Sequence, residues 1–159
     1  MRRQRVYVET TIPSYYHTSR TSPKMIAERD ITREWWARAT TRCELVTGVA
    51  VEDEVEAGPG AETALRVELL APLTVLARTA EVDETADALI RHKVMPAYPS
   101  MDALHLALAM HHECQALVMW DRKHLANPGK ATHLARVAER LGLAAPSIVT
   151  PREHLRRLR

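Results

Sequence analysis

Residues 100–125 decide the fold that we expect, because they join a helix pattern to a buried strand. Residues 100–109 read SMDALHLALA, and residues 116–125 read ALVMWDRKHL. Ser100 can cap a helix whose first turn holds Asp102, where the helix dipole favours an anion. The apolar run before Asp121 is typical of a strand buried on both faces, and open α/β sheets carry their sites just beyond such strands. Each acid alone is most simply a cap or a turn residue, but folding could bring the two together.

Strands and helices alternate along the rest of the chain. Short β-rich or apolar runs stand at residues 5–8, 43–47, 73–76 and 147–149, between helix patterns that begin near residues 22, 49, 61, 83, 131 and 150. We expect two of these helices to face the core through apolar residues at helical spacing, the first with Ala27, Ile31, Trp35 and Ala39, and the second with Ala64, Leu65 and Leu69. The alternation predicts a mostly parallel sheet with helices on both faces.

The composition limits the class of protein. A chain of 159 residues with 46% hydrophobic content can build one core, so we expect a single domain over residues 1–159. The net charge of +2 does not by itself indicate a nucleic-acid binder. Cys43 and Cys114 stand beside apolar neighbours, which predicts buried thiols in a reducing compartment. Without an apolar leader or a run long enough to span a membrane, we expect a soluble, cytoplasmic protein.

Glu9 follows the first predicted strand directly, and so occupies the same structural place as Asp121. Thr10 and Thr11 put hydroxyl groups beside it. A surface glutamate that caps a turn is the simpler interpretation. The first strand is expected to be central, however, which would place Glu9 in a crevice. Further acids cluster at residues 52–56, and spacing alone does not choose one member of that cluster as functional.

Carboxylates that gather around a crevice repel one another unless a cation compensates their charge. Oxygen ligands without a cysteine or histidine cluster suit Mg²⁺ or Mn²⁺ better than zinc. Such a site supports phosphodiester hydrolysis, because the metal lowers the pKa of a bound water, orients it in line and stabilises the leaving oxygen. The histidines share no zinc-ligand spacing, and we interpret His105 as a packed residue able to hydrogen-bond an acid.

Several segments, taken in order, resemble the motifs of PIN-domain proteins, and most closely those of VapC-like toxins of bacterial toxin–antitoxin pairs. They are residues 6–15 (VYVETTIPSY), 51–58 (VEDEVEAG), 101–107 (MDALHLA), 120–125 (WDRKHL) and 148–151 (IVTP). The DALHLA segment is fairly specific, and the ordered set spans essentially the whole chain. The resemblance implies a three-layer α/β/α PIN-like domain with a central, mostly parallel sheet of about five short strands.

The resemblance also implies a function and a set of site residues. Proteins of this kind are usually dimeric ribonucleases that cut RNA with Mg²⁺ or Mn²⁺, and the toxins bind a cognate antitoxin protein. Matched position by position, Glu9, Glu54 and Asp102 stand at the first, second and third metal-binding acids. Asp121 matches a fourth position, filled by Asp or Asn. These four acids are the expected catalytic and metal-binding residues.

The threonines beside Glu9 extend the resemblance, and two positions depart from the family pattern. Thr10 or Thr11 stands where a hydroxyl helps to hold metal or water. Glu9 stands where the family more often has Asp, and its extra methylene moves the carboxylate outward, which could shift or weaken one metal. His124 falls where some members carry a further acid, which leaves the fourth ligand open.

Three hypotheses follow. The first is a metal-dependent ribonuclease that acts as the toxin of a toxin–antitoxin pair. The second is a PIN-like binding module with weakened catalysis that acts through a protein partner, which Glu9 in place of Asp keeps open. The third is a phosphatase-type α/β hydrolase of small phosphates. It ranks low, because the sequence lacks an Asp-x-Asp after the first strand and a phosphate-cradling glycine loop.

Overall fold

The computed structural model describes residues 2–58, 60–96, 101–120 and 128–158 of the chain. The predicted helix cap Ser100, the predicted ligand Asp121 and His124 lie outside the described residues. Within the described ranges, no helix is long and apolar enough to cross a membrane. Cys43 and Cys114 are both buried free thiols, as predicted.

The described strands form one sheet in which every pairing is parallel, in the order β3-β2-β1-β4-β5. They are β1 (Arg5–Val8), β2 (Glu44–Gly48), β3 (Thr74–Leu76), β4 (Ala116–Val118) and β5 (Ser147–Val149). The predicted parallel sheet is therefore confirmed, with β1 at its centre. Val6, Tyr7 and Val8 are fully buried, as expected for a strand covered on both faces.

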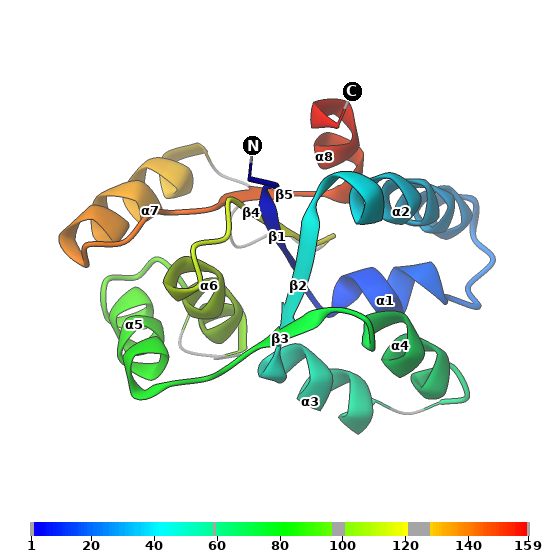
Figure 1. Ribbon diagram of the computed structural model, residues 1–159, viewed down its shortest axis with the longest axis horizontal. Coiled ribbons are helices and arrows are strands. Elements are labelled where there is room, and N and C mark those ends of the chain that lie inside the picture. The colour runs from blue at the N-terminus through cyan, green and yellow to red at the C-terminus, as the bar shows by residue number, and fades with distance from the viewer. Residues whose placement is uncertain (1, 59, 97–100, 121–127, 159) are drawn as a thin grey trace.

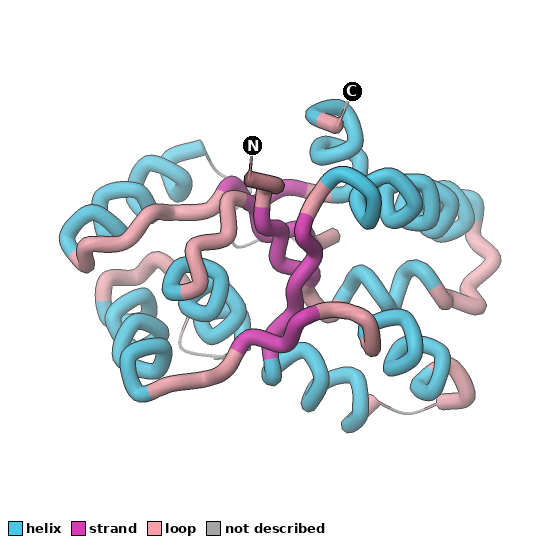
Figure 2. Tube along the Cα trace, viewed as in Figure 1, coloured by secondary structure: helices cyan, strands magenta, loops and turns pink. Residues whose placement is uncertain are grey.

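Helices cover both faces of the sheet. They are α1 (Thr11–Tyr16), α2 (Pro23–Arg42), α3 (Val49–Ala57), α4 (Thr63–Leu70), α5 (Ala80–Arg91), α6 (Met101–His111), α7 (Pro128–Arg140) and α8 (Pro151–Arg157). In Figure 1, α5, α6 and α7 lie on one side of the strands, while α1, α2, α4 and α8 lie on the other. Figure 2 shows the strands as a narrow layer between the two sets of helices, which is the predicted three-layer α/β/α arrangement.

Polar side chains cap several helices, two of them at the predicted starts near residues 22 and 150. The Oγ of Ser22 accepts a hydrogen bond from the backbone N–H of Met25 at 3.2 Å, and Pro23 opens α2. Thr150 caps α8 in the same way, ahead of Pro151. The helix predicted from residue 83 begins earlier, at Ala80, because the side chain of Thr79 caps it.

The predicted core face of α2 is only partly correct. Trp35 and Ala39 are fully buried, but Ala27 is exposed, and Thr32 takes the buried place in the middle of the helix. With 20 residues, α2 is about 30 Å long, whereas a four-residue strand spans only about 13 Å. The first turns of α2 therefore extend past the sheet that they were expected to cover.

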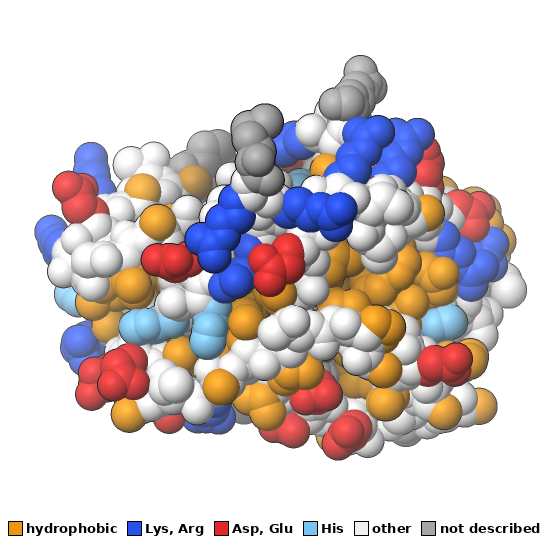
Figure 3. All heavy atoms as spheres, viewed as in Figure 1, with side chains coloured by type: hydrophobic (Ala, Val, Ile, Leu, Met, Phe, Trp, Pro, Cys, Tyr) orange, Lys and Arg blue, Asp and Glu red, His pale blue; other side chains and the backbone are white. Residues whose placement is uncertain are grey.

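The predicted core face of α4 is wrong. Leu65 is 46% exposed, and Leu70 is the buried residue of this helix. The reason is that α4 packs against α1 and α3, away from the sheet. Its apolar side chains instead help to line a groove of about 370 Å³, together with Tyr16, Trp36 and Leu73. Figure 3 shows hydrophobic side chains gathered in this hollow between α2 and α4.

Candidate active site

Glu9 lies at the carboxyl end of the central strand, where β1 gives way to α1. Its backbone N–H still donates to the carbonyl of Val118 in β4, at 3.3 Å. Its side chain is buried, with 6% of the residue exposed. In a parallel sheet the carboxyl ends of all strands lie at the same edge. The ends of the neighbouring strands β2 and β4 therefore lie at the same edge as Glu9. The sequence rule therefore placed Glu9 correctly.

Thr11 holds the carboxylate of Glu9. Both its backbone N–H and its hydroxyl donate to Oε1 of Glu9, each at 2.6 Å. The same hydroxyl accepts a hydrogen bond from the backbone N–H of Trp120, just beyond β4, at 2.9 Å. Thr11 therefore ties the end of β4 to the Glu9 side chain and fixes the position of that carboxylate.

The surroundings of the buried Glu9 carboxyl compensate its charged form poorly. Burial raises the pKa of Glu9 above its ordinary value of 4.5, and the nearby carboxylate of Glu54 adds to the rise. His105 and the hydrogen bonds from Thr11 oppose the rise in this pKa without cancelling it. A buried acid beside a second acid is the electrostatic situation that a bound cation would relieve.

Glu54 approaches Glu9 from α3. Val51 and Val55 face the core and so fix the helix, while the Glu54 side chain remains 34% exposed. Its Oε1 accepts a hydrogen bond from the hydroxyl of Thr10 at 2.9 Å. Because Thr10 directly follows Glu9, this bond ties α3 to the end of β1.

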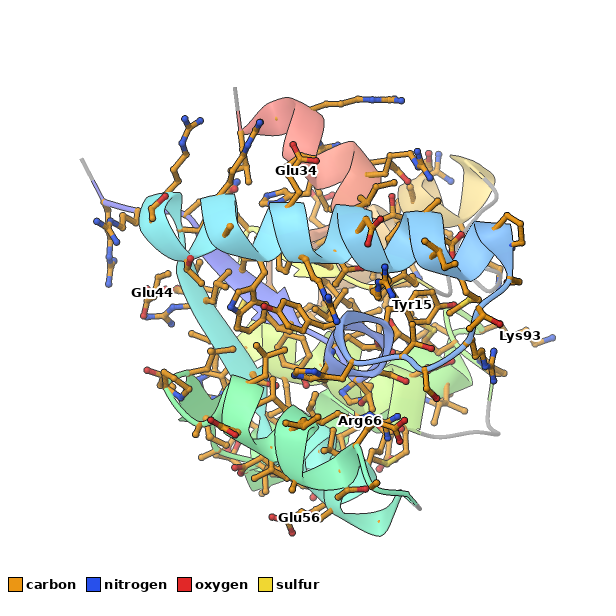
Figure 4. The ribbon with its side chains drawn as sticks, turned by 90° about the vertical axis from the view of Figure 1, so that its right-hand side faces the viewer. Tyr15, Glu34, Glu44, Glu56, Arg66 and Lys93 are labelled. Atoms are coloured by element: carbon orange, nitrogen blue, oxygen red, sulfur yellow. The ribbon has the colours of Figure 1, made fainter. Side chains whose placement is uncertain are left out.

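Glu54 is held in its ionised form. His105 hydrogen-bonds Oε1 of Glu54 through Nε2, at 2.5 Å. Burial by itself would raise the pKa of Glu54, but the hydrogen bond and charge of His105 and the bond from Thr10 outweigh it. The pKa of Glu54 therefore lies below its ordinary value. Among the acids of its cluster, Asp53 and Glu56 are exposed, and Glu56 points away from the molecule in Figure 4.

His105 also belongs to the site, and the sequence did not identify its hydrogen-bond partners. It lies on α6 and is 2% exposed. While Nε2 faces Glu54, Nδ1 lies 2.8 Å from the hydroxyl of Tyr7 in β1. A buried tyrosine hydroxyl normally finds a polar partner, so a tyrosine inside a strand covered on both faces was the available signal. The interpretation of His105 as a packed residue that hydrogen-bonds an acid is confirmed.

Asp102 lies in the first turn of α6, one helical turn before His105, and is partly exposed. Its helix packs against α3, which carries Glu54. Among the described residues, no three His, Cys, Asp or Glu side chains form a group that could hold a metal ion by themselves. The structure thus brings Glu9 and Glu54 together and places Asp102 on the adjacent helix. The roles of these three acids, and of Asp121, stay predictions.

The residues present nevertheless fit a hard divalent cation. The donors at the carboxyl end of β1 are carboxylate oxygens from Glu9 and Glu54 with threonine hydroxyls between them. Mg²⁺ and Mn²⁺ prefer oxygen ligands of this kind. The raised pKa of the buried Glu9 is the second sign, because positive charge at this edge would offset the cost of burying a carboxylate.

Comparison with known families connects this geometry to a named fold. The profile of the PIN domain matches residues 6–130, from β1 into α7. The chain belongs to the PIN-domain family. The matched range contains the four acids predicted for the site. The resemblance seen in the sequence is therefore confirmed for the PIN domain as a whole.

Solved structures share the fold of this PIN domain at low sequence identity. The toxin VapC20 of Mycobacterium tuberculosis, described as cleaving the sarcin–ricin loop, is 19% identical, with a TM-score of 0.57, 76% of this chain and 93% of that chain covered. A chain of the VapBC2 complex of Rickettsia felis, bound to promoter DNA, is 12% identical, with a TM-score of 0.54, 92% of this chain and 98% of that chain covered. Comparison with curated proteins gives no significant match.

Proposed function

We propose that this PIN domain is a Mg²⁺- or Mn²⁺-dependent endoribonuclease and the toxin of a type II toxin–antitoxin pair. The observation that carries the proposal is the meeting of Glu9 and Glu54 at the carboxyl end of the central strand. Two of the solved structures that share the fold are a ribonuclease toxin and a toxin–antitoxin complex. The substrate expected from the first of these is a structured RNA loop.

The proposed site works through negative charge that the fold arranges in advance. Glu9, Glu54, Asp102 and Asp121 would hold the divalent cation, which when bound supplies an activated water and stabilises the leaving oxygen. Thr11 holds the carboxylate of Glu9, and His105 keeps Glu54 ionised. Because these side chains are already oriented, little reorganisation is needed when the RNA phosphate arrives.

The test is cleavage of RNA by the purified protein. We expect cleavage with Mg²⁺ or Mn²⁺ and none in excess chelator. Asp102→Asn keeps the size of the side chain and removes its charge, so it should abolish cleavage with an unchanged circular dichroism spectrum. Asp53→Asn is the matched control, because Asp53 is an exposed acid of α3, and it should cut like the parent. Cleavage by Asp102→Asn at the parental rate would contradict its assignment.

Complete inactivity of the well-folded parent would favour the alternative, a PIN-like binding module with weakened catalysis that acts through a protein partner. A substrate screen should therefore include single-stranded RNA, hairpins and an isolated sarcin–ricin loop. The same preparations should be measured by light scattering, because a homodimer is expected for this family.

The apolar groove between α2 and α4 supports an antitoxin partner. Tyr16, Trp36 and Leu65 line it, and Leu65 is among the exposed large apolar residues. Exposed apolar grooves commonly receive the apolar face of a partner helix. If the neighbouring gene encodes a small protein, that protein should co-purify with this chain and inhibit cleavage. Leu65→Arg should weaken that complex, while Leu141→Arg, at an exposed leucine after α7, should not.

A further inference from the structure

A hydrogen-bonded chain runs from the core of the sheet to the candidate site. The hydroxyl of Tyr7 lies 2.8 Å from Nδ1 of His105, and Nε2 of His105 lies 2.5 Å from Oε1 of Glu54. Tyr7 and His105 are both buried, whereas Glu54 is partly exposed. The chain therefore links the central strand, α6 and α3, and its outer end is a carboxylate of the site.

The ionised carboxylate of Glu54 sets the direction of the outer hydrogen bond. Glu54 is ionised and can only accept, so Nε2 of His105 carries the proton that it donates. The hydroxyl of Tyr7 can pair with Nδ1 whatever charge the ring carries, as donor to a bare nitrogen or as acceptor from an N–H. Burial raises the pKa of Tyr7 well above 10.0, so this hydroxyl keeps its proton. Tyr7 thereby holds the ring of His105 in the orientation in which Nε2 faces Glu54.

We propose that Tyr7 and His105 are positioning residues, which fix the carboxylate of Glu54 beside Glu9 for the divalent cation. The inference rests on the proposed metal-dependent function. It gives two buried residues a role in that function through Glu54, without contact with metal or RNA. Mutation of a side chain that hydrogen-bonds and orients a metal ligand commonly lowers metal affinity or activity by about 10- to 100-fold. Tyr7 acts on Glu54 through His105, and His105 acts on it directly.

Gly48 gives the Tyr7 hydroxyl the space that this arrangement needs. Gly48 ends β2 and lies at the start of α3, the helix that carries Glu54. A Cβ atom there would collide with the Tyr7 hydroxyl and would lie 2.7 Å from Cδ1 of Leu108. Any larger residue at position 48 must therefore displace Tyr7, Leu108 or the start of α3. The absent side chain lets the central tyrosine reach His105.

A second buried histidine shows what a purely structural pair looks like. His154 of α8 is 1% exposed, and its Nδ1 accepts a hydrogen bond from Nε1 of Trp35 at 2.9 Å. That pair joins α2 to α8 on one face of the sheet. The other ring nitrogen of His154, Nε2, lies 3.4 Å from the amide oxygen of Gln4. The hydrogen bonds described for His154 therefore reach no carboxylate. His154 is therefore the matched control for His105.

The experiment measures Mn²⁺ affinity directly, by electron paramagnetic resonance or calorimetry, besides cleavage of RNA. Full-length His105→Leu should raise the Kd for Mn²⁺ by about tenfold or more. His105→Gln should recover most of the affinity, because its amide nitrogen can reach the place of Nε2. Tyr7→Phe should weaken binding less, since His105 loses its anchor but remains. His154→Leu should lower the melting temperature yet keep the Mn²⁺ Kd within about twofold of the parent, because distant sites couple weakly.

Two results would overturn the inference, and they are distinguishable. If the parent binds Mn²⁺ and cuts RNA while His105→Leu and Tyr7→Phe bind Mn²⁺ equally well, the pair is structural and the proposed function stands. If the parent neither binds Mn²⁺ nor cuts RNA, the proposed function fails and takes the inference with it. Tyr7→Phe keeps the aromatic ring in the core, so it decides the question even where His105→Leu does not fold.

Discussion

Both ends of the sheet carry ionisable side chains, but these side chains differ in burial and in the charge of their neighbours. At the amino end, Nε of Arg5 lies 3.2 Å from Oε2 of Glu44, and the two side chains are 28% and 43% exposed. At the carboxyl end, Glu9 is buried beside Glu54. Figure 4 shows Glu44 at the outer edge of the molecule, well separated from Tyr15 in α1, the helix that begins beyond Glu9.

The difference between the two ends agrees with the function proposed for the carboxyl end. The amino end pairs opposite charges in contact with water, an arrangement that contributes at most about 1 kcal/mol. The carboxyl end places like charges together and buries one of them, which costs free energy of folding. The proposed function would place the cation where this cost arises. Substitutions at the two ends test whether they differ in this way.

The largest effect is expected at Glu9. Glu9→Gln removes a charge from the predicted cation site while Thr11 can still donate to the new amide oxygen. Its loss of cleavage should exceed the roughly 10- to 100-fold typical of an outer-shell partner. Glu9→Asp draws the carboxylate back by one methylene and should change metal preference or affinity modestly. Rates measured against Mg²⁺ and Mn²⁺ concentration for the three proteins test this. Equal activity of the parent and Glu9→Gln would remove Glu9 from the site.

The next effect concerns metal-dependent stability. A ligand that binds only the native state adds about 2.7 kcal/mol at a hundredfold excess over Kd. Mn²⁺ should therefore raise the melting temperature, and Glu54→Gln should reduce that rise. Glu56→Gln is the control, because Glu56 is exposed and points outward (Figure 4). If millimolar Mn²⁺ leaves the melting temperature of the parent unchanged, the acidic end of the sheet binds no cation.

Much of the fold and part of the site follow from the sequence. Alternating patterns predicted the parallel sheet, and the rule that sites lie beyond strand ends placed Glu9. Glu54 was chosen only by resemblance, because nothing within residues 52–56 separates its acids. The contact with Thr10 and His105 separates them in the structure.

Other features could not be predicted from local pattern. Tyr7 and His105 are 98 positions apart, and their contact depends on how α6 packs against the sheet. The exposure of Leu65 follows from which neighbours α4 meets, whereas the helical spacing of its apolar residues shows only that one face is apolar. Tertiary packing, in both cases, decides what the periodicity leaves open.

A smaller effect is expected in the pH dependence of metal-free stability. The folded pKa of Glu9 is raised, so its contribution to stability is full below about the ordinary value of 4.5 and is lost as pH rises through the folded pKa. Glu54 has a lowered pKa and acts in the opposite sense, losing its contribution as pH falls. In chelator, Glu9→Gln should therefore gain stability relative to the parent as pH rises. Urea unfolding of both proteins from pH 4 to pH 8 measures this, and parallel curves would contradict it.

The smallest effect is expected at the amino end. Glu44→Gln removes the charge that faces Arg5, but both side chains are partly exposed and screened by water. Arg5 also keeps its hydrogen bond to the carbonyl of His112 at 2.7 Å. The free energy of unfolding should fall by about 0–1 kcal/mol, with no change in RNA cleavage or in Mn²⁺ affinity. A larger loss, or any change in metal binding, would mean that the two ends of the sheet are coupled. Urea unfolding and Mn²⁺ titration of Glu44→Gln beside Glu54→Gln measure both quantities on the two ends at once.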